Sequence, residues 1–409
     1  MGQSLNLAVV GCGLGGLTAA CLLRDQGHKV TIFDQFDTPA PVGSGLIIQP
    51  VGQDVLAQLG VLSAAIGHGV KISDLTGQSE PGGVTALKAS YGSGRFGLAI
   101  HRGTLFEVLL AAARARGVEI EPGSFVLDAD EDFGAPYLRI EGGREAGPFD
   151  LVVDAGGAGS PLSPLVSRPL PYGALWGVVD LPDGERDLGG VLRQRYVAAH
   201  KMAGVLPIGT LPGDPTPKAA IFWSLRHDAY PDWRAADIED WHAEISDLWP
   251  DFGYLAEPIR SHDDLTFAAY CHGSLFRPWT KSVFHIGDAA HQASPQLGQG
   301  ANMALLDASA LAHALEPGLR GARRRYVAQR FAHVRIYQGL SAAFTPLYQS
   351  NWRWLGGLRD KVLTPVSARP WPAKVITRVI CGDLVPPYGF AKRAPVPEVA
   401  GSALHEPGE

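Results

Sequence analysis

A glycine-rich turn between an expected strand and an expected helix places the strongest constraint on how this chain can fold. Residues 7–10 form an apolar run suited to a buried parallel strand, Gly11-Cys12-Gly13-Leu14-Gly15-Gly16 follows at once, and residues 17–26 have helical spacing. The first glycine permits a tight turn, the second lets a pyrophosphate approach the backbone, and the last lets helix and strand pack closely. The helix N-terminus presents free N–H groups to phosphates. The expected dinucleotide contacts here are Gly11, Gly13, Leu14, Gly15 and Gly16.

An acidic residue follows the next expected strand, as a dinucleotide site requires. Residues 29–33 alternate into a second strand that ends at Asp34, whose carboxylate can accept hydrogen bonds from a ribose diol. Glycine turns also arise for purely steric reasons, but strand, turn, helix and terminal acid in this order favour a dinucleotide site. Which dinucleotide binds stays open at this point.

Bulk properties narrow the class of protein. A chain of 409 residues that is 46% hydrophobic is expected to form two closely joined domains. Its net charge of −6 offers no general field for nucleic acid or anionic lipid, so a small-molecule partner is expected. The four cysteines include no Cys-x-x-Cys pair, so we expect reduced thiols in a cytoplasmic protein and no metal site. Without a signal peptide or an apolar stretch of roughly 18 residues, stable membrane insertion is not expected.

A second motif points to a flavin. Residues 282–286 are expected to form a buried strand that runs into Gly287-Asp288, and a turn at residues 298–302 precedes a helix over residues 303–315. The Asp288 carboxylate could bond the hydroxyls of a ribityl chain, which plain NAD lacks. Backbone amides of the turn and the positive helix end would stabilise negative charge at the N1–C2=O edge of a reduced flavin. The expected FAD contacts are Asp288, Gly298, Gly300, Ala301 and Asn302.

In this order, the motifs closely resemble those of the para-hydroxybenzoate hydroxylase-like, or group A, FAD-dependent monooxygenases. The resemblance covers roughly residues 5–345. Two further segments match the family: the glycine-rich residues 43–50 and the sequence His101-Arg102-Gly103-Thr104-Leu105. The resemblance implies that Gly45 lies at the cofactor and that Arg102 meets the FAD phosphates or ribityl chain, a role suited to a permanently charged fork donor.

The resemblance implies an α/β fold in which a Rossmann-like FAD-binding domain holds an inserted antiparallel-sheet substrate domain and is followed by a C-terminal helical cap. The expected FAD-binding domain is discontinuous, with residues 1–75, 98–162 and 278–320. The substrate-binding domain would take residues 76–97 and 163–277, the helical cap residues 321–392, and a loose tail residues 393–409. The cap could provide a dimer or substrate-entry surface, and a homodimer is left open.

The chemistry implied by the family is hydroxylation of a small aromatic or heteroaromatic substrate. NADH or NADPH would reduce FAD, dioxygen would form a flavin C4a-hydroperoxide, and its distal oxygen would attack the substrate. The isoalloxazine carries this reaction. No catalytic side chain is assigned from the sequence.

One family motif departs from its pattern. The family has an Asp-Gly pair after a strand, whereas Gly156 stands here in place of the aspartate. This change puts nicotinamide handling in doubt, and Asp154 is a hypothetical substitute from a shifted register. Two alternatives stay open: another flavin oxidoreductase on the same scaffold, either a reductase or a halogenase, and a flavin-binding protein without nicotinamide-driven turnover. The halogenase motif Trp-x-Trp-x-Ile-Pro is absent.

Candidate substrate contacts come from the middle of the chain and from the flavin loop. Residues 170–181, 194–206 and 218–225 are expected to be strands of the substrate sheet. Aromatic residues in a sheet are more often core than ligand contacts. The candidate substrate contacts are Tyr196, His200 and Trp223 in this region, and His291 and Gln296 beside the flavin loop.

Overall fold

The first layer of the protein is a mainly parallel sheet. The computed structural model describes residues 4–38, 44–132, 135–182, 184–185 and 187–389. The strand order is β18-β19-β12-β1-β2-β8, and only β18 runs antiparallel to its neighbour. The strands are β1 (Asn6–Val10), β2 (Lys29–Phe33), β8 (Glu119–Glu121), β12 (Leu151–Asp154), β18 (Trp279–Thr280) and β19 (Val283–His285). The Rossmann-like sheet expected from the glycine turn is confirmed.

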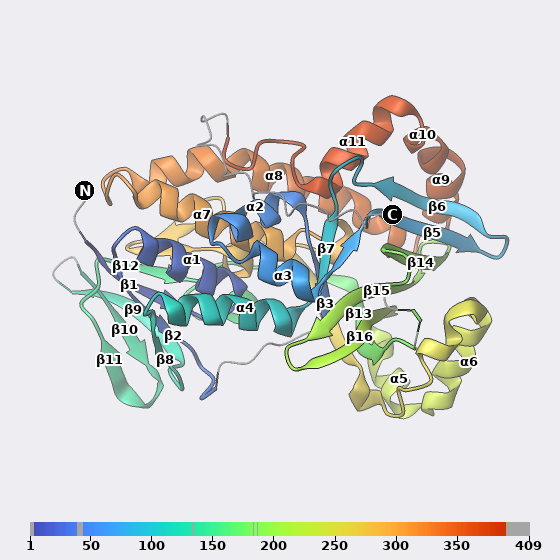
Figure 1. Cartoon of the computed structure of the whole chain (residues 1–409), viewed down its shortest axis with the longest axis horizontal. Helices are drawn as coiled ribbons and strands as arrows, with labels where there is room; N and C mark the ends of the chain where they lie inside the picture. The colour runs from blue at the N-terminus through green and yellow to red at the C-terminus, as the bar shows by residue number, and fades with distance from the viewer. Residues whose placement is uncertain (1–3, 39–43, 133–134, 183, 186, 390–409) are drawn as a thin grey trace, which may run out of the picture.

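Helices cover this sheet because its central strands are mainly apolar and buried. The residues of β1 after Asn6 are all buried, as parallel strands between helices must be. Helix α1 (Leu14–Asp25) packs against α7 (Gly300–Leu315) so closely that a Cβ at Gly15 would lie 3.3 Å from the Cβ of Ala304. The other helices of this half are α2 (Pro50–Gln58), α3 (Leu62–His68) and α4 (Arg102–Ala115) (Figure 1).

The second layer is a large, mainly antiparallel sheet in the order β20-β17-β13-β16-β15-β14-β5-β6. Its strands are β5 (Asp74–Glu80), β6 (Val84–Ser90), β13 (Arg168–Asp180), β14 (Val191–Val197), β15 (Lys201–Leu211), β16 (Asp214–Arg226), β17 (Thr266–Ser274) and β20 (His291–Gln292). The short helices α5 (Tyr230–Ala235) and α6 (Ile238–Leu248) lie beside it (Figure 1). The expected antiparallel substrate sheet is confirmed, but the single strand expected over residues 194–206 is wrong. It is two strands, β14 and β15, which turn at Ala198 with φ +48°.

Two small sheets complete the strand content. One has the order β11-β10-β9, from β9 (Val126–Asp132), β10 (Ala135–Ile140) and β11 (Arg144–Ala146). The other has the order β3-β7-β4, from β3 (Gly45–Ile48), β4 (Val70–Ile72) and β7 (Gly97–His101). The second links the two halves of the molecule, since a Cβ at Gly45 would lie 2.4 Å from Ile208 of β15.

The chain ends in the expected helical region. The long helix α8 (Ala322–Tyr348) is followed by α9 (Arg353–Leu358), a π-helical turn (Arg359–Leu363), α10 (Thr364–Ser367) and α11 (Pro370–Cys381). The expected loose tail at 393–409 lies outside the described residues, and the domain limits stay a proposal. Within the described ranges, no helix has both the length and the apolar character to cross a lipid bilayer.

A buried ionic network ties α7 and α8 to the turn after β19. The Asp307 carboxylate accepts hydrogen bonds from Arg330 Nε at 2.7 Å, from His291 Nε2 at 2.6 Å and from the Gly287 backbone amide at 3.0 Å. His291 and Arg330 hold the pKa of Asp307 well below its usual value even though burial alone would raise it. Beside it, His333 donates through Nε2 to the Gly382 carbonyl at 2.8 Å. Burial and the neighbouring Arg330 lower the pKa of His333 to about 3.

We predict that His333 makes the fold sensitive to mild acid. Between pH 6.5 and 3 the unfolded chain takes up a proton at His333 that the folded protein excludes, so stability falls as pH falls through this window. The slope from this one group approaches about 1.4 kcal/mol per pH unit below its unfolded pKa. Urea unfolding from pH 7.5 to pH 4.5 should therefore show a smaller loss for His333→Gln than for the wild type. His28, His101 and His272, whose pKa values burial also lowers, retain part of the dependence. Equal slopes in the two proteins would contradict the assignment.

Candidate FAD and substrate site

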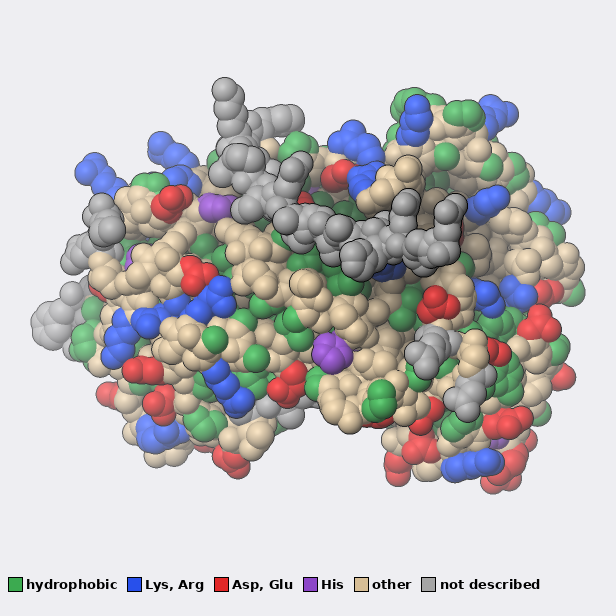
Figure 2. Space-filling view, in the orientation of Figure 1, with side chains coloured by type: hydrophobic (Ala, Val, Ile, Leu, Met, Phe, Trp, Pro, Cys, Tyr) green, Lys and Arg blue, Asp and Glu red, His purple; other side chains and the backbone are tan. Residues whose placement is uncertain are grey.

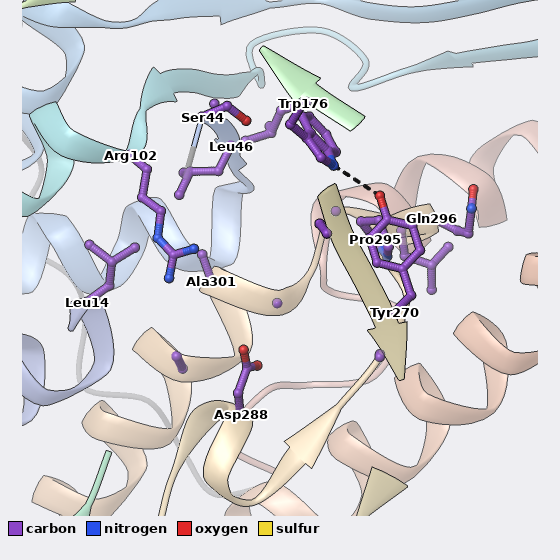
Figure 3. Close-up of a pocket in the computed structure, with 18 of the residues that line it drawn as sticks. Leu14, Ser44, Leu46, Arg102, Trp176, Tyr270, Asp288, Pro295, Gln296 and Ala301 are labelled. Carbon is purple, nitrogen blue, oxygen red and sulfur yellow. Dashed lines mark hydrogen bonds between the residues drawn. The ribbon is translucent and has the colours of Figure 1, made fainter. Parts of the chain in front are cut away.

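A large cavity is lined by residues from both main sheets. Its volume is about 1160 Å³, and its lining comes from the carboxyl ends of β1, β2, β12 and β19 and from the large antiparallel sheet. Pockets for one drug-sized ligand hold roughly 300–1,000 Å³, so this cavity has room for a dinucleotide and a second small molecule. Figure 3 shows side chains from both halves of the chain directed into it.

The glycine turn forms one end of the cavity. Gly11 has φ +100°, and a Cβ there would lie 2.5 Å from the Ala155 carbonyl oxygen, so only glycine fits. A Cβ at Gly16 would lie 2.0 Å from the Gly11 carbonyl oxygen, which agrees with a packing role; Gly16 does not line the cavity. At Gly13 the backbone faces open space. Because no side chain caps α1, its first N–H groups are available to an anion.

Asp34 lies beside this turn at the end of β2. One carboxylate oxygen accepts from the Cys12 backbone amide at 2.7 Å, and the other accepts from the Phe36 amide at 3.0 Å. Each oxygen keeps a further lone pair for a hydroxyl donor, so the side chain can still bind a ribose diol. Burial and the nearby Asp34 raise the pKa of the adjacent Cys12 thiol to about 12, which favours the protonated thiol over the nucleophilic thiolate.

Arg102 and Asp288 enter the cavity from two different elements, the start of α4 and the turn after β19 (Figure 3). Asp288 is exposed to the cavity but otherwise surrounded by protein, which raises its pKa, while His291 and Arg102 oppose that rise. Arg102 is also exposed to the cavity. A permanent cation and a carboxylate in one polar region suit phosphates and a polyol chain.

The loop at 295–301 faces the same region. Gly298 adopts φ +59°, and α7 begins at Gly300, earlier than the expected residue 303, so Gly300 and Ala301 form its uncapped first turn. Both residues line the cavity. Their N–H groups lie at the positive end of a 16-residue helix.

Asn302, the last of the expected FAD contacts in this turn, does not line the cavity. The side chain is fully buried: its Oδ1 accepts from the Gln49 amide at 2.8 Å, and its Nδ2 donates to the Ile47 and Gly298 carbonyls. Asn302 thus links β3 to the loop by forming hydrogen bonds with buried backbone groups of both segments. Asn302 thereby holds the loop in place and does not line the cavity.

The carboxylate missing at Gly156 is present two residues earlier. Asp154 Oδ1 accepts from the Gly156 amide at 3.0 Å and from Ser160 Oγ at 2.7 Å, and Oδ2 pairs with His285 Nδ1 at 2.7 Å. Asp154 and His285 are both fully buried. Gly156 and Ser160 line the cavity, so Asp154 shapes the turn from behind and does not reach into the cavity itself.

We predict that Asp154→Ala destabilises the protein by about 3 kcal/mol, because it leaves His285 and the Gly156 amide without their acceptor in the core. Ser160→Ala removes one bond and should cost about 1 kcal/mol. Denaturant unfolding of both variants measures the difference, and the FAD dissociation constant should rise in the same order. Equal costs would show that Asp154 does not organise the turn.

The other end of the cavity is lined mainly by apolar and aromatic side chains from the large sheet. Trp176 Nε1 donates to the Tyr270 hydroxyl at 3.1 Å (Figure 3), and both residues line the cavity, as do Pro295 and Gln296. Burial raises the pKa of Tyr270 well above its usual value, so its hydroxyl keeps its proton. The hydroxyl therefore accepts one hydrogen bond and can donate another.

A buried arginine lies at the far wall. The guanidinium of Arg359 lies over the rings of Tyr196 and Tyr348, at 4.5 and 5.2 Å from their centroids. It also donates to Ser79 Oγ at 2.6 Å, to the Leu347 carbonyl at 3.0 Å and to Asp360 at 2.6 Å. With these partners its charge is already compensated, so it mainly fixes the two tyrosine rings that line the cavity.

The five candidate substrate contacts divide between the cavity and the core. Tyr196 and Gln296 line the cavity; Gln296 is oriented by Gln349 at 2.8 Å. Trp223 does not line the cavity, because it packs with Trp241 on the opposite face of β16. The preceding residue, Phe222, points to the other face of the strand and lines the cavity. His200 lies in the β14–β15 turn, and His291 is held by Asp307. Neither histidine lines the cavity.

Sequence reasoning missed Tyr270 and Arg359, although a signal existed for the first. On β17 the cavity residues Thr266, Ala268 and Tyr270 alternate with a period of two, as does the run Leu192, Gln194 and Tyr196 on β14. Arg359 had no such signal, because its partners come from β5, α8 and the π-helical turn, which only the fold brings together.

Comparison with known proteins agrees with this geometry. The model of a family described as "FAD binding domain" matches residues 4–243 and 255–336. A 3-amino-4-hydroxybenzoate 2-monooxygenase of Streptomyces cremeus is 28% identical over 77% of this chain and 79% of its own. A kynurenine 3-monooxygenase of Salinispora arenicola is 27% identical over 96% of this chain and 88% of its own.

Solved structures share the fold. A 2-methyl-3-hydroxypyridine-5-carboxylic acid oxygenase superposes with a TM-score of 0.74 at 20% identity, covering 95% of this chain and 99% of that one. The HpxO protein of Klebsiella pneumoniae, complexed with FAD and uric acid, gives 0.74 at 19% identity over 92% and 97%.

The chain belongs to this FAD-binding family, in its para-hydroxybenzoate hydroxylase-like branch of FAD-dependent monooxygenases. It is therefore an oxidoreductase that uses FAD together with NADH or NADPH, as the motifs predicted. The comparisons favour this function over the reductase, halogenase and non-catalytic alternatives.

Proposed function

We propose that the protein uses FAD, a nicotinamide donor and O2 to hydroxylate a small, largely apolar aromatic or heteroaromatic compound. When bound, FAD accepts a hydride from NADH or NADPH and activates dioxygen for transfer of one oxygen atom to the substrate. The observation that carries the proposal is the continuity of one cavity from the glycine turn to the Trp176–Tyr270 pair. The free cysteines among the described residues support a reducing, cytoplasmic setting.

The polar end of the cavity supplies groups that fit FAD. The amides at Gly13, Leu14 and Gly15 would bind the pyrophosphate at the start of α1, and Gly11, whose own amide donates to the Phe33 carbonyl, would let the chain turn beside it. Asp34 would bind the ribose, and Asp288 would bind the ribityl hydroxyls. Arg102 would neutralise phosphate charge, while Gly45, which lines the cavity, would contact the cofactor through its backbone. The amides at Gly300 and Ala301 would stabilise negative charge on the reduced ring system, and Gly298, whose amide donates to the Pro295 carbonyl, would shape the turn before them.

The apolar end fits a flat substrate beside that ring system. Phe222, Leu206 and Met202 offer apolar contact, and they exclude water from the oxygen transfer. Tyr270 would donate its hydroxyl proton in a hydrogen bond to an oxygen or nitrogen acceptor of the substrate. Tyr196 and Gln296 would contact the edge of the substrate ring. These residues orient the substrate; no side chain is assigned as a general base.

The decisive experiment follows the flavin absorbance of the purified holoprotein. Under anaerobic conditions, NADH or NADPH should bleach it faster in the presence of one member of a panel of aromatic and heteroaromatic compounds. With air readmitted, that compound should gain 16 mass units, and 18 mass units under ¹⁸O₂. Bound FAD that neither nucleotide reduces, with any compound of a broad panel, would contradict the proposal.

We predict that Tyr270→Phe weakens substrate orientation without loss of FAD. The change removes both the acceptor for Trp176 Nε1 and the proposed donor to the substrate, so KM should rise about tenfold, equivalent to one hydrogen bond of about 1.4 kcal/mol. More of the consumed NAD(P)H should appear as hydrogen peroxide, because a misplaced substrate is not hydroxylated. Tyr172→Phe is the matched control, since its hydroxyl bonds Asn351 outside the cavity lining. Equal peroxide yields in the two variants would remove Tyr270 from the site.

A further inference from the structure

The helices that follow α8 expose an unusual set of large apolar side chains. Trp352 and Trp354 are each 63% exposed and Trp371 is 75% exposed. The exposed apolar set within α9–α11 and its flanks is Trp352, Trp354, Val362, Leu363, Val366 and Trp371. Single exposed apolar residues are ordinary, but six within twenty residues indicate a contact surface.

Trp352 and Trp354 stay exposed to solvent while α9 packs on the large sheet through another residue. A Cβ at Gly356 would lie 2.6 Å from the Ala198 backbone, so α9 packs directly on the β14–β15 turn through that glycine. The rings of Trp352 and Trp354 stack on each other, with centroids 6.3 Å apart and planes at 14°. The two stacked rings therefore form a preformed apolar surface that is exposed to solvent.

The same helices are positively charged. Residues 352–381 contain six Lys or Arg and one Asp, a net charge of +5 in a chain of net charge −6. The one acid, Asp360, is paired with the buried Arg359. The exposed cations are Lys361, Arg369 and Lys374, together with Arg378, which pairs with Asp383 at 3.9 Å. In Figure 2, blue and green side chains mix over the corner of the molecule where Figure 1 places α9, α10 and α11. We call these exposed apolar and basic residues the cap surface.

The cap surface is also a wall of the cavity. Leu363 and Thr364 at the start of α10, Ser367 at its end and Ile376 of α11 line the cavity, and so does the exposed Lys88 of β6. One group of helices therefore contacts both the solvent and the apolar end of the cavity.

We infer that the cap surface binds peripherally to the anionic face of a lipid bilayer. Tryptophan prefers the headgroup level, where its ring is apolar and its N–H is hydrated, and Lys and Arg side chains pair with lipid phosphates. Resting on the proposed function, an apolar substrate dissolved in the bilayer then enters the cavity beside α10 and α11. Such binding involves no spanning helix.

Self-association is a poorer fit to the same surface. A two-fold interface places the same patch on both subunits, so the exposed cations would face one another. An anionic partner neutralises them instead. The homodimer left open by the sequence is therefore not assigned to the cap surface.

Co-sedimentation of the FAD-loaded protein with lipid vesicles tests the inference. Vesicles of phosphatidylcholine with 30% phosphatidylglycerol should bind the wild type at least tenfold more tightly than phosphatidylcholine alone, and 0.5 M salt should weaken this binding. Lys361→Glu with Lys374→Glu should reduce binding tenfold or more, and so should Trp354→Ala with Trp371→Ala. The matched controls are Arg323→Glu with Arg324→Glu, two exposed arginines of α8, and Phe276→Ala, an exposed aromatic residue outside the cap surface. Each variant is accepted only with wild-type FAD content and melting temperature.

Three outcomes overturn the inference: no binding to anionic vesicles, equal losses in the cap and control variants, or lipid-independent dimers that the tryptophan changes abolish. Vesicle binding is measured without turnover, so it stands or falls separately from the hydroxylase proposal. In a second measurement, the Lys361→Glu with Lys374→Glu protein should show a raised KM for a vesicle-dissolved substrate with kcat unchanged. An unchanged KM would overturn only the substrate-entry step.

Discussion

The contact between α1 and the end of β1 is the constraint on which the rest of the structure depends. The Gly11 carbonyl oxygen packs directly against Gly16, and Gly11 packs against Ala155. A side chain at either glycine would collide with these backbone atoms and keep the helix from reaching the sheet. Backbone hydrogen bonds then join the ends of neighbouring strands. The amides of Gly11, Ala155 and Ile286 donate to the carbonyls of Phe33, Val10 and Asp154, respectively. The carboxyl ends of four strands are thereby brought level at one edge, where a doubly wound sheet binds its ligand.

Buried polar groups behind that edge position the residues that line the cavity. Asp154 holds the Gly156–Ser160 turn, Asp307 holds Gly287 beside Asp288, and Asn302 holds the loop that contains Gly298. These side chains are buried, and their hydrogen bonds go to backbone groups or neighbouring side chains and not into the cavity. This division leaves the polar end rigid and able to accept a charged cofactor. The turn that contains Gly156 is likewise held by the Asp154 carboxylate.

The large antiparallel sheet and the terminal helices give the cavity a different character at its other end. Phe222, Tyr196, Trp176 and Tyr270 supply rings, and the cation of Arg359 is compensated before any ligand arrives. The helices that close this end continue into a surface that is both apolar and basic. The route to the substrate pocket and the surface of the cap are thus properties of the same segment.

The sequence by itself determined the FAD-binding half, because each step of that motif is local: strand, glycine turn, helix and terminal acid lie within thirty residues, and their sterics allow few alternatives. Strand patterns along the chain also indicated the second sheet, although residues 194–206 form two strands and not one, and the family resemblance implied the C-terminal helices. Only the tertiary structure decided which face of each strand points to the cavity. On β16, Trp223 points into the core and Phe222 points into the cavity. The same holds for His291 and Asn302, whose roles depend on Asp307, Gln49 and Ile47. Arg359 could not be predicted, because its partners meet it only after the two halves of the chain have packed.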